Sequence, residues 1–298
     1  MPMEAMHAQM SDKAGFIAAL DQSGGSTPGA LRGYGIPDDA YSGDAQMFQL
    51  IHDMRVRIMT APAFTGEKVI GAILFERTMD GAVENHPVPS YLWQQRGIVP
   101  FLKIDKGLEA EADGVRLMKP NPDLDKLLER AAGLGIYGTK ERSTIGHASP
   151  TGIAAIVAQQ IEIGAQVAKH GLVPILEPEV LIGSPDKAKA EEILLAELTR
   201  QIEAAPGDWP LMLKLTIPNT PDLYAGLIAH ARIARVVALS GGYQRDDACQ
   251  RLAHNHGMIA SFSRALLDDL KRSMSDAEFD RALGAAIDEI YQASTIKN

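Results

Sequence analysis

The sequence predicts an α/β fold, a (β/α)8 TIM barrel, from three observations. Short apolar runs recur along the chain, and segments with the spacing of amphipathic helices separate them. The 298 residues suffice for a single barrel, and no Gly/Ser-rich linker divides them. The runs also reach the number that a closed barrel requires: residues 16–20, 69–75, 98–104, 136–140, 172–176, 211–215, 235–239 and 258–262.

Helices are expected in the segments that connect these strands. Ser149 and Pro150 precede the amphipathic residues 151–169, which is a common way for a helix to begin. Residues 1–14 are predicted to form a helix that closes the bottom of the barrel, and residues 275–298 a last amphipathic helix. The whole chain is therefore expected to form one barrel domain.

Charge and hydropathy exclude several classes of protein. The chain carries 38 acidic and 29 basic residues, and its net charge of -9 disfavours nucleic acid or anionic lipid as the main partner. No apolar run approaches the roughly 20 residues of a membrane helix, and no targeting segment is recognised at the start. With a single cysteine, the composition suits a reducing compartment, so a cytoplasmic protein is expected.

Neither a metal ion nor another cofactor is expected. His254 and His256 form an HxH pair ahead of the eighth strand, but no partner stands at ligand spacing, so a surface turn is predicted there. Cys249 cannot supply a thiolate cluster on its own. It lies in an amphipathic helical segment, where a packing role is expected.

Most of the predicted strands end in polar or charged residues. In an α/β barrel, the C-terminal ends of the strands and the loops that follow them form the active site. We therefore expect the site to be built from these strand ends. Their residues are Asp21, Lys103, Asp105, Lys140, Arg142, Glu177, Glu179, Lys214, Ser240, Ser261 and Arg264.

Lys214 is the most informative of these residues. It lies inside the apolar run 211–215, where burial of an ammonium group is costly. Apolar walls and a second cation, such as Lys140, are expected to favour the uncharged amine, which can attack a carbonyl. The alternative is a purely structural salt bridge between Lys214 and Glu177.

Glu177 and Glu179 stand two residues apart after the fifth apolar run. One of them is expected to point toward the barrel axis and the other away or into the rim. A carboxylate beside a Schiff-base lysine can shuttle protons during carbinolamine dehydration and carbon–carbon cleavage. The alternative is a pair of solvated surface glutamates.

Two glycine-containing segments that follow strands suit an anion. Residues 21–26 follow the first strand, and Ser240, Gly241 and Gly242 follow the seventh. Glycines there let backbone N–H groups approach a phosphate, and the loops after the last two barrel strands commonly bind one. Arg264 is expected to add a charge-assisted contact. A simple turn is the alternative explanation of each glycine pair.

A second basic cluster is expected across the mouth of the barrel. Lys103 and Lys106 come at the end of the third strand, and Lys140 and Arg142 at the end of the fourth. Two anion sites imply a substrate that is phosphorylated at both ends. The alternative is that both segments are solvated rims.

Together the strand ends and loops described above resemble one family, the class I fructose-1,6-bisphosphate aldolases, and in particular its shorter bacterial branch. The resemblance implies a metal-independent lyase that reversibly cleaves fructose 1,6-bisphosphate to dihydroxyacetone phosphate and glyceraldehyde 3-phosphate in glycolysis and gluconeogenesis. It extends over residues 16–265, and its matching segments are FIAALDQSGGSTP, GAILFERTMDG, VPFLKIDKGL, GTKERS, GLVPILEPEV, LMLKLTIPN, VVALSGGY and IASFSRAL.

The resemblance also implies a role for each site residue. Lys214 would form the imine with the ketose and Glu177 would accept protons. Asp21 would assist carbinolamine chemistry, and Lys140 would supply positive charge beside the reacting carbons. The dihydroxyacetone-phosphate end would be held by Ser240, Gly241 and Arg264, and the predicted binding set is completed by Gly242, Ser261 and, toward the other phosphate, Ser23, Ser26, Lys103 and Arg142.

Two features depart from the family pattern. Longer animal and plant members have a C-terminal tail whose final tyrosine takes part in enamine protonation, whereas this sequence reads to Asn298 without one. Gln22 stands where the longer enzymes carry a glutamate. Two other functions stay open: a transaldolase-like Schiff-base barrel that acts on a monophosphorylated sugar, and a non-catalytic barrel scaffold.

Overall fold

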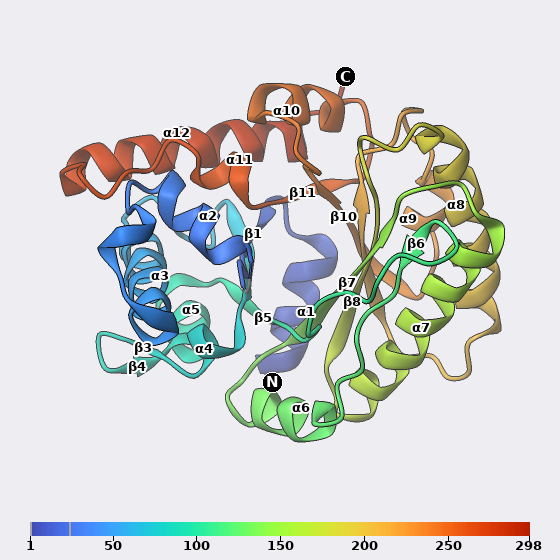
Figure 1. Cartoon of the computed structure of the whole chain (residues 1–298), viewed down its shortest axis with the longest axis horizontal. Coiled ribbons are helices and arrows are strands. Elements are labelled where there is room, and N and C mark those ends of the chain that lie inside the picture. The colour runs from blue at the N-terminus through green and yellow to red at the C-terminus, as the bar shows by residue number, and fades with distance from the viewer. Residues whose placement is uncertain (1, 24) are drawn as a thin grey trace.

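Every predicted strand forms in the computed structural model, which describes residues 2–23 and 25–298 (Figure 1). Within these residues eight parallel strands close into a barrel, because β5 pairs with β7 as well as with β2. The predicted (β/α)8 barrel is thus confirmed. Its strands are β1 (Phe16–Leu20), β2 (Val69–Leu74), β5 (Val99–Lys103), β7 (Gly138–Ile145), β8 (Val173–Val180), β9 (Leu211–Thr216), β10 (Ile233–Leu239) and β11 (Ile259–Phe262).

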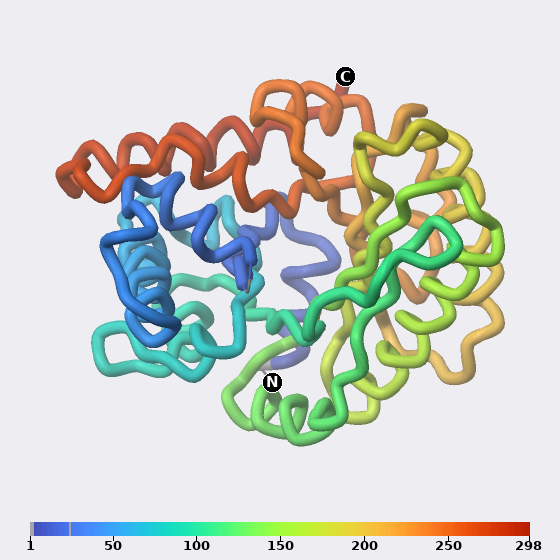
Figure 2. Tube along the Cα trace, viewed as in Figure 1, coloured from blue at the N-terminus to red at the C-terminus, as the bar shows by residue number. Residues whose placement is uncertain are grey.

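Among the residues that the structure describes, three short strands in two hairpins lie outside the eight-stranded barrel. The hairpin of residues 108–118 adds β6 (Val115–Arg116) antiparallel to β7, and Figure 2 shows this segment folding back on itself beside the barrel. A second hairpin pairs β3 (Ala82–Val83) with β4 (His86–Pro87).

The lower half of the barrel is filled by apolar side chains. Residues two apart on a strand share a face, so Ile17 and Ala19 point inward, whereas Phe16, Ala18 and Leu20 pack outward against helices. Helix α1 (Pro2–Asp12) closes the bottom as predicted, and its Met6 and Met10 join the inner cluster. The inner cluster also contains Ile70, Ile73, Val99, Phe101, Tyr137, Val173, Ile175, Met212, Val237 and Ile259.

The outer layer consists of helices whose apolar faces cover the strands. In Figure 1, α7 and α8 lie together on one flank of the barrel, and α2 to α5 lie on the opposite flank. The bounds are α2 (Ser26–Gly33), α3 (Gly43–Thr60), α4 (Glu76–Met79), α5 (Val88–Arg96), α6 (Leu124–Gly133), α7 (Pro150–Lys169), α8 (Lys187–Ala204), α9 (Ala225–Ile228), α10 (Arg245–Ala253), α11 (Arg264–Leu267) and α12 (Asp276–Thr295), with a 3-10 turn at Asp38–Ala40.

Local signals explain where the long helices begin. Ser149 accepts a hydrogen bond from the Gly152 N–H and Pro150 occupies the first turn of α7. Ser275 and Glu278 form a capping box at the start of α12, the last helix, which packs on α10 and α11. No helix in the described part of the chain is both long and apolar enough for a membrane crossing.

The sequence underestimated two strands. β7 and β8 continue to Ile145 and Val180, several residues beyond the predicted ends at 140 and 176. The extra residues include charged side chains that read as loop in the sequence. Arg142, Glu177 and Glu179 among them line the cavity at the mouth of the barrel, so this extension carries polar side chains of the site.

Candidate active site

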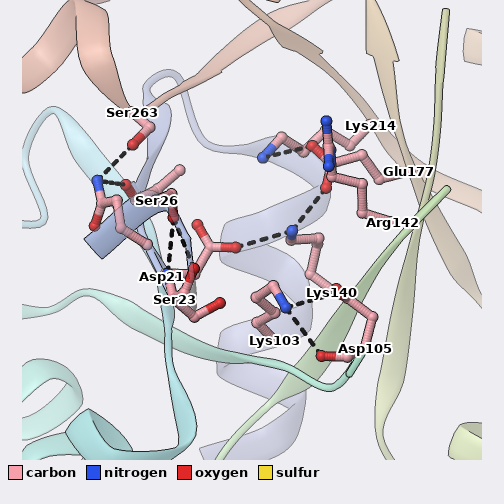
Figure 3. Close-up of polar contacts among 12 residues, drawn as sticks. Asp21, Ser23, Ser26, Lys103, Asp105, Lys140, Arg142, Glu177, Lys214 and Ser263 are labelled. Carbon is pink, nitrogen blue, oxygen red and sulfur yellow. Dashed lines mark hydrogen bonds and ion pairs between the residues drawn. The ribbon is translucent and has the colours of Figure 1, made fainter. Parts of the chain in front are cut away.

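A cavity of about 930 Å³ opens at the C-terminal ends of the strands. It begins where the apolar filling of the barrel stops, and its walls come from seven of the eight barrel strands and their loops. Every predicted site residue except Gly242 lines it, and Figure 3 shows polar contacts that join Asp21, Lys140, Glu177 and Lys214. These lining residues are Asp21, Ser23, Ser26, Lys103, Lys140, Arg142, Glu177, Lys214, Ser240, Gly241, Ser261 and Arg264.

Lys214 projects from β9 into the base of this cavity. Its neighbours Leu213 and Leu215 belong to the outer core and Met212 to the inner one, so the strand alternation directs Lys214 inward. The residue is only 4% exposed. Its Nζ lies 3.0 Å from Glu177 Oε1, and this carboxylate comes from the adjacent strand, β8.

Lys140 forms the centre of the ion-pair network. Its Nζ lies 2.8 Å from Asp21 Oδ2 and 2.7 Å from Glu177 Oε2 (Figure 3). Burial works to lower the pKa of Lys140, but the charges of Asp21 and Glu177 outweigh it and raise the pKa above its ordinary value. Lys140 is therefore a fixed cation between two carboxylates.

Both carboxylates of this network are ionised. Burial acts to raise the pKa of Asp21, but the nearby Lys140, Lys214 and Lys103 hold it well below its usual range. In the same way, burial opposes but Lys140 and Lys214 lower the pKa of Glu177. Glu177 is thus an anion in contact with two amines, and it can accept a proton from a group that enters the cavity.

The expectation that only one of Glu177 and Glu179 points toward the barrel axis, and the other away or into the rim, is wrong. Both lie within β8 and both line the cavity, because residues two apart on a strand share a face. Glu179 Oε2 accepts a hydrogen bond from Arg142 Nε at 2.5 Å. Its partner is therefore the cation of the neighbouring strand β7 rather than solvent.

The predicted basic cluster is present but carries its own counter-ions. Lys103 Nζ lies 2.6 Å from Asp105 Oδ1, and Lys106 Nζ lies 2.9 Å from Glu76 Oε2. Arg142 and Lys140 pair with the carboxylates described above. An anion at this end of the cavity must therefore compete with carboxylates for each cation.

The opposite end of the cavity is more receptive to an anion. The Arg264 side chain forms no ion pair or hydrogen bond with the described residues; burial raises the pKa of nearby Asp268, and the charge of Arg264 only partly offsets this. Ser240 and Ser261 are buried at neighbouring strand ends, and Ser261 Oγ has no protein partner among the residues described. These groups can meet a phosphate without first breaking a pair.

Glycine is required in the loop after β10. Gly241 and Gly242 have φ values of 63° and 118°, which side-chain-bearing residues rarely adopt. A Cβ on Gly241 would lie 2.7 Å from Ile182 Cγ2. Gly242 does not line the cavity, but a Cβ there would lie 3.3 Å from Arg264 Nη2, so its small size leaves room for the guanidinium.

Ser23 and Ser26 shape the entrance above β1. Ser26 begins α2, and its Oγ accepts from the Ser23 N–H at 3.0 Å and donates to the Ser23 carbonyl at 2.9 Å. Both serines line the cavity. These two hydrogen bonds hold Ser23 and Ser26 together at the wall of the cavity.

Three residues of the site were missed or undervalued in the sequence. Asp105 was noted only as a strand end, yet it is the counter-ion of Lys103. Arg55 is buried on α3, and Ser263 precedes Arg264. Arg55 and Ser263 both form hydrogen bonds with Gln22. A buried arginine on a helix leaves no local sequence signal, whereas the serine of SFSR could have been found by its place beside Arg264.

The histidines and the cysteine lie away from this cavity. His254 ends α10, and His256 Nδ1 lies 2.9 Å from Asp222 Oδ2 at the surface, as the predicted turn requires. Cys249 is buried on α10, and burial raises the pKa of its thiol to about 12, which suits packing. The described residues contain no group of three or more His, Cys, Asp or Glu that could hold a metal ion.

Comparison with known proteins shows the family of the chain. Residues 50–204 match the family described as fructose-bisphosphate aldolase class-I. The chain is 55% identical to the fructose-bisphosphate aldolase class 1 of Porphyromonas gingivalis, over 96% of this chain and 97% of that one. It is 54% identical to the protein of the same name from Synechocystis sp., over 98% of each.

The chain belongs to the class I fructose-bisphosphate aldolase family. Among solved structures, the fructose-bisphosphate aldolase of Plasmodium falciparum, crystallised with TRAP and a small-molecule inhibitor, superposes with a TM-score of 0.80. That match covers 100% of this chain and 96% of the other at 19% identity, so it supports the shared fold. The resemblance that the motifs predicted is therefore confirmed across the length of this aldolase.

Proposed function

We propose that this aldolase cleaves fructose 1,6-bisphosphate through a Schiff base on Lys214. The observation that carries the proposal is the buried Lys214 amine, 3.0 Å from the ionised Glu177, at the base of a cavity with cations at both ends. An amine so placed can attack a ketone while the carboxylate handles protons. Arg264 at one end, and Lys103 with Arg142 at the other, match a substrate phosphorylated at both ends.

The proposed reaction uses each residue at a defined atom. Lys214 Nζ passes a proton to Glu177 across their 3.0 Å contact, and the free amine bonds to C2 of the ketose. Glu177 returns the proton to the carbinolamine hydroxyl, which leaves as water and gives a protonated imine. Glu177 takes the proton of the C4 hydroxyl, the C3–C4 bond breaks, and its electron pair moves toward the imine nitrogen. Glyceraldehyde 3-phosphate leaves, and the enamine takes a proton at C3 and is hydrolysed to dihydroxyacetone phosphate.

Asp21 and Lys140 support these steps electrostatically. Lys140 stays charged between two carboxylates, and it stabilises the oxyanion that forms at C4 as the proton leaves. Asp21 forms an ion pair with the same cation, so Lys140 keeps an anionic partner when Glu177 becomes protonated. No step needs a metal ion, so we propose that the reaction is metal-independent.

Reductive trapping tests the proposal. Borohydride added in the presence of dihydroxyacetone phosphate reduces the imine to a stable secondary amine, and peptide mapping should place the label on Lys214. A label on another lysine, or none, rejects the assignment. Full cleavage activity in EDTA is expected, and loss of activity in chelator would contradict metal independence.

A second candidate is a Schiff-base enzyme of the transaldolase type with a monophosphorylated substrate. The observation in its favour is that Lys103 and Arg142 already pair with carboxylates, whereas Arg264 does not. Under this candidate, Lys103→Ala and Arg142→Ala leave the KM nearly unchanged. Under the main proposal, each raises the KM for fructose 1,6-bisphosphate about tenfold or more, as expected for a charged hydrogen bond.

We further propose that the chain works as one barrel domain in the cytoplasm. The strands that contribute to the cavity span β1 to β11, so no part of the barrel forms the site alone. The single cysteine suits a reducing compartment. Fractionation of the cells that produce the chain tests the location.

A further inference from the structure

A guanidinium lies directly behind the cavity wall. Arg55 comes from α3 and is 1% exposed, yet no carboxylate within the described part of the chain pairs with it. Its Nη1 donates to Thr78 Oγ1 at 2.7 Å, and its Nη2 donates to the backbone carbonyl of Gln22 at 2.6 Å. The Asp21 carboxylate acts on this guanidinium without forming a close ion pair, and a buried charge without a paired counter-ion is costly, so these contacts point to a specific task.

Arg55 fixes the orientation of the Gln22 side-chain amide. Guanidinium N–H groups only donate, so the amide atom 3.2 Å from Arg55 Nη2 is the carbonyl oxygen Oε1. The NH2 group of Gln22 must then face the other way. There its Nε2 donates to Ser263 Oγ at 2.5 Å and more weakly to the Ala19 carbonyl at 3.4 Å.

Ser263 receives this hydrogen bond and keeps its own hydrogen free. It stands at the N-cap position of α11, but its side chain makes no capping bond. Across residues 2–23 and 25–298 the Ser263 hydroxyl (Figure 3) finds no acceptor, and Ser263 lines the cavity, as does its chain neighbour Arg264. Because Ser263 Oγ accepts a hydrogen bond from Gln22, its O–H bond points away from Gln22 and toward the open cavity.

We propose that Arg55, Gln22 and Ser263 form a directional hydrogen-bond relay that aims the Ser263 hydroxyl hydrogen at the anionic group that Arg264 binds. Ser263 is then a substrate-binding residue, and Arg55 and Gln22 are positioning residues. The inference rests on the proposed function, because the acceptor is the phosphate of the substrate. The guanidinium charge polarises the relay, since hydrogen bonds in a chain strengthen one another.

Binding measurements on the full chain test the role of Ser263. Titration calorimetry with inorganic phosphate and with dihydroxyacetone phosphate should show about tenfold weaker binding for Ser263→Ala, the usual effect of losing a hydrogen bond to a charged group. Ser273→Ala, an exposed serine outside the cavity, serves as the matched control and should bind normally. Binding by Ser263→Ala within twofold of the unsubstituted chain overturns the proposal.

Gln22→Glu tests the direction of the relay. The new carboxylate can accept from Arg55 as the amide oxygen does, so the fold keeps this contact. It has no N–H for Ser263, whose hydroxyl then donates to the carboxylate rather than to the ligand. We expect about tenfold weaker phosphate binding in the parent chain but a much smaller change in the Ser263→Ala background. Equal effects in both backgrounds overturn the relay and leave only charge repulsion.

Cleavage of fructose 1,6-bisphosphate by the same samples separates this inference from the proposed function. Normal cleavage by the unsubstituted chain, with Ser263→Ala binding unchanged, overturns the relay alone. Absence of cleavage, with phosphate binding that depends on Ser263, overturns the proposed function and supports the relay as an anion site.

Discussion

At the scale of single residues, the proposed chemistry depends most on Lys214. Lys214→Met keeps most of the side-chain volume but removes the nucleophile, so we expect kcat for cleavage to fall by about a thousandfold or more. Glu177 keeps its 2.7 Å ion pair with Lys140, so the folded structure should persist. A coupled assay of triose phosphate release measures the loss, with circular dichroism as the control. Normal turnover by this variant contradicts the Schiff-base proposal.

Glu177 gives a prediction for the pH dependence. Glu177→Gln should lower kcat by about a hundredfold to ten-thousandfold with little change in KM, because a general base acts in the transition state. Lys140 and Lys214 depress the pKa of Glu177 below its ordinary 4.5. This group therefore stays ionised as the pH falls, and kcat/KM should not decline on its account until the pH is below 4.5. An acidic limb that starts above that pH and vanishes in Glu177→Gln contradicts the assignment.

At the scale of elements, the loop after β10 depends on backbone conformation. Gly241→Ala forces a side chain into φ 63° and brings its Cβ to 2.7 Å from Ile182 Cγ2. Strain of about 1–3 kcal/mol is expected, and the loop should shift away from Arg264. We expect KM for fructose 1,6-bisphosphate to rise about tenfold.

Gly183→Ala is the matched control for this loop. Gly183 is exposed, adjacent to Ile182 in sequence, and a Cβ there meets nothing within 4 Å. Its KM should stay within twofold of the parent. If Gly241→Ala and Gly183→Ala behave alike, the loop geometry does not govern anion binding.

The strands also show how much of the fold can be predicted from the sequence. Apolar runs located all eight strands, because barrel strands are buried on both faces and read as continuous hydrophobic segments. The ends of β7 and β8 were placed too early, since charged residues that face an internal cavity look like loop residues in the sequence.

The site divides in the same way. Strand ends brought Asp21, Lys140, Glu177 and Lys214 to one place, because parallel strands present their C-terminal ends at a common edge. The relay from Arg55 to Ser263 joins residues more than two hundred positions apart through the Gln22 amide, and no local pattern encodes it. Hydrogen-bond direction emerges only when helix α3 packs behind β1 and the loop after β11.

At the scale of the whole molecule, one buried acid should limit stability. Glu141 lies on the outer face of β7, with 0% exposure and no partner for either carboxylate oxygen among the described residues. Within residues 2–23 and 25–298, Thr139 Oγ1 and Gln160 Oε1 also lack partners in this layer, where the Gln160 amide N–H donates to Ser143 on the same strand face. Burial, with a smaller effect of Asp105, raises the pKa of Glu141 well above its ordinary 4.5.

The sign of the resulting pH dependence follows from proton linkage. Below pH 4.5 Glu141 is protonated in both the folded and the unfolded chain, so it adds no pH dependence. Above that value the unfolded chain releases the proton while the folded chain retains it, and the free energy of unfolding falls as the pH rises. Glu141→Gln, which is neutral at every pH, should therefore have a higher Tm than the parent at pH 8, by about 2 °C or more.

The Tm values of Glu141→Gln and of the parent should converge as the pH approaches 4.5, because the carboxylic acid and the amide are then both uncharged. Thermal unfolding followed by circular dichroism at several pH values measures the difference, and Glu203→Gln, on the exposed face of α8, should show no such divergence. Cleavage activity should be retained in both variants, since Glu141 faces the helices rather than the cavity. A Glu141→Gln variant that is less stable at pH 8 than at pH 4.5, relative to the parent, would mean that the carboxylate is ionised in the folded chain and has a cationic partner.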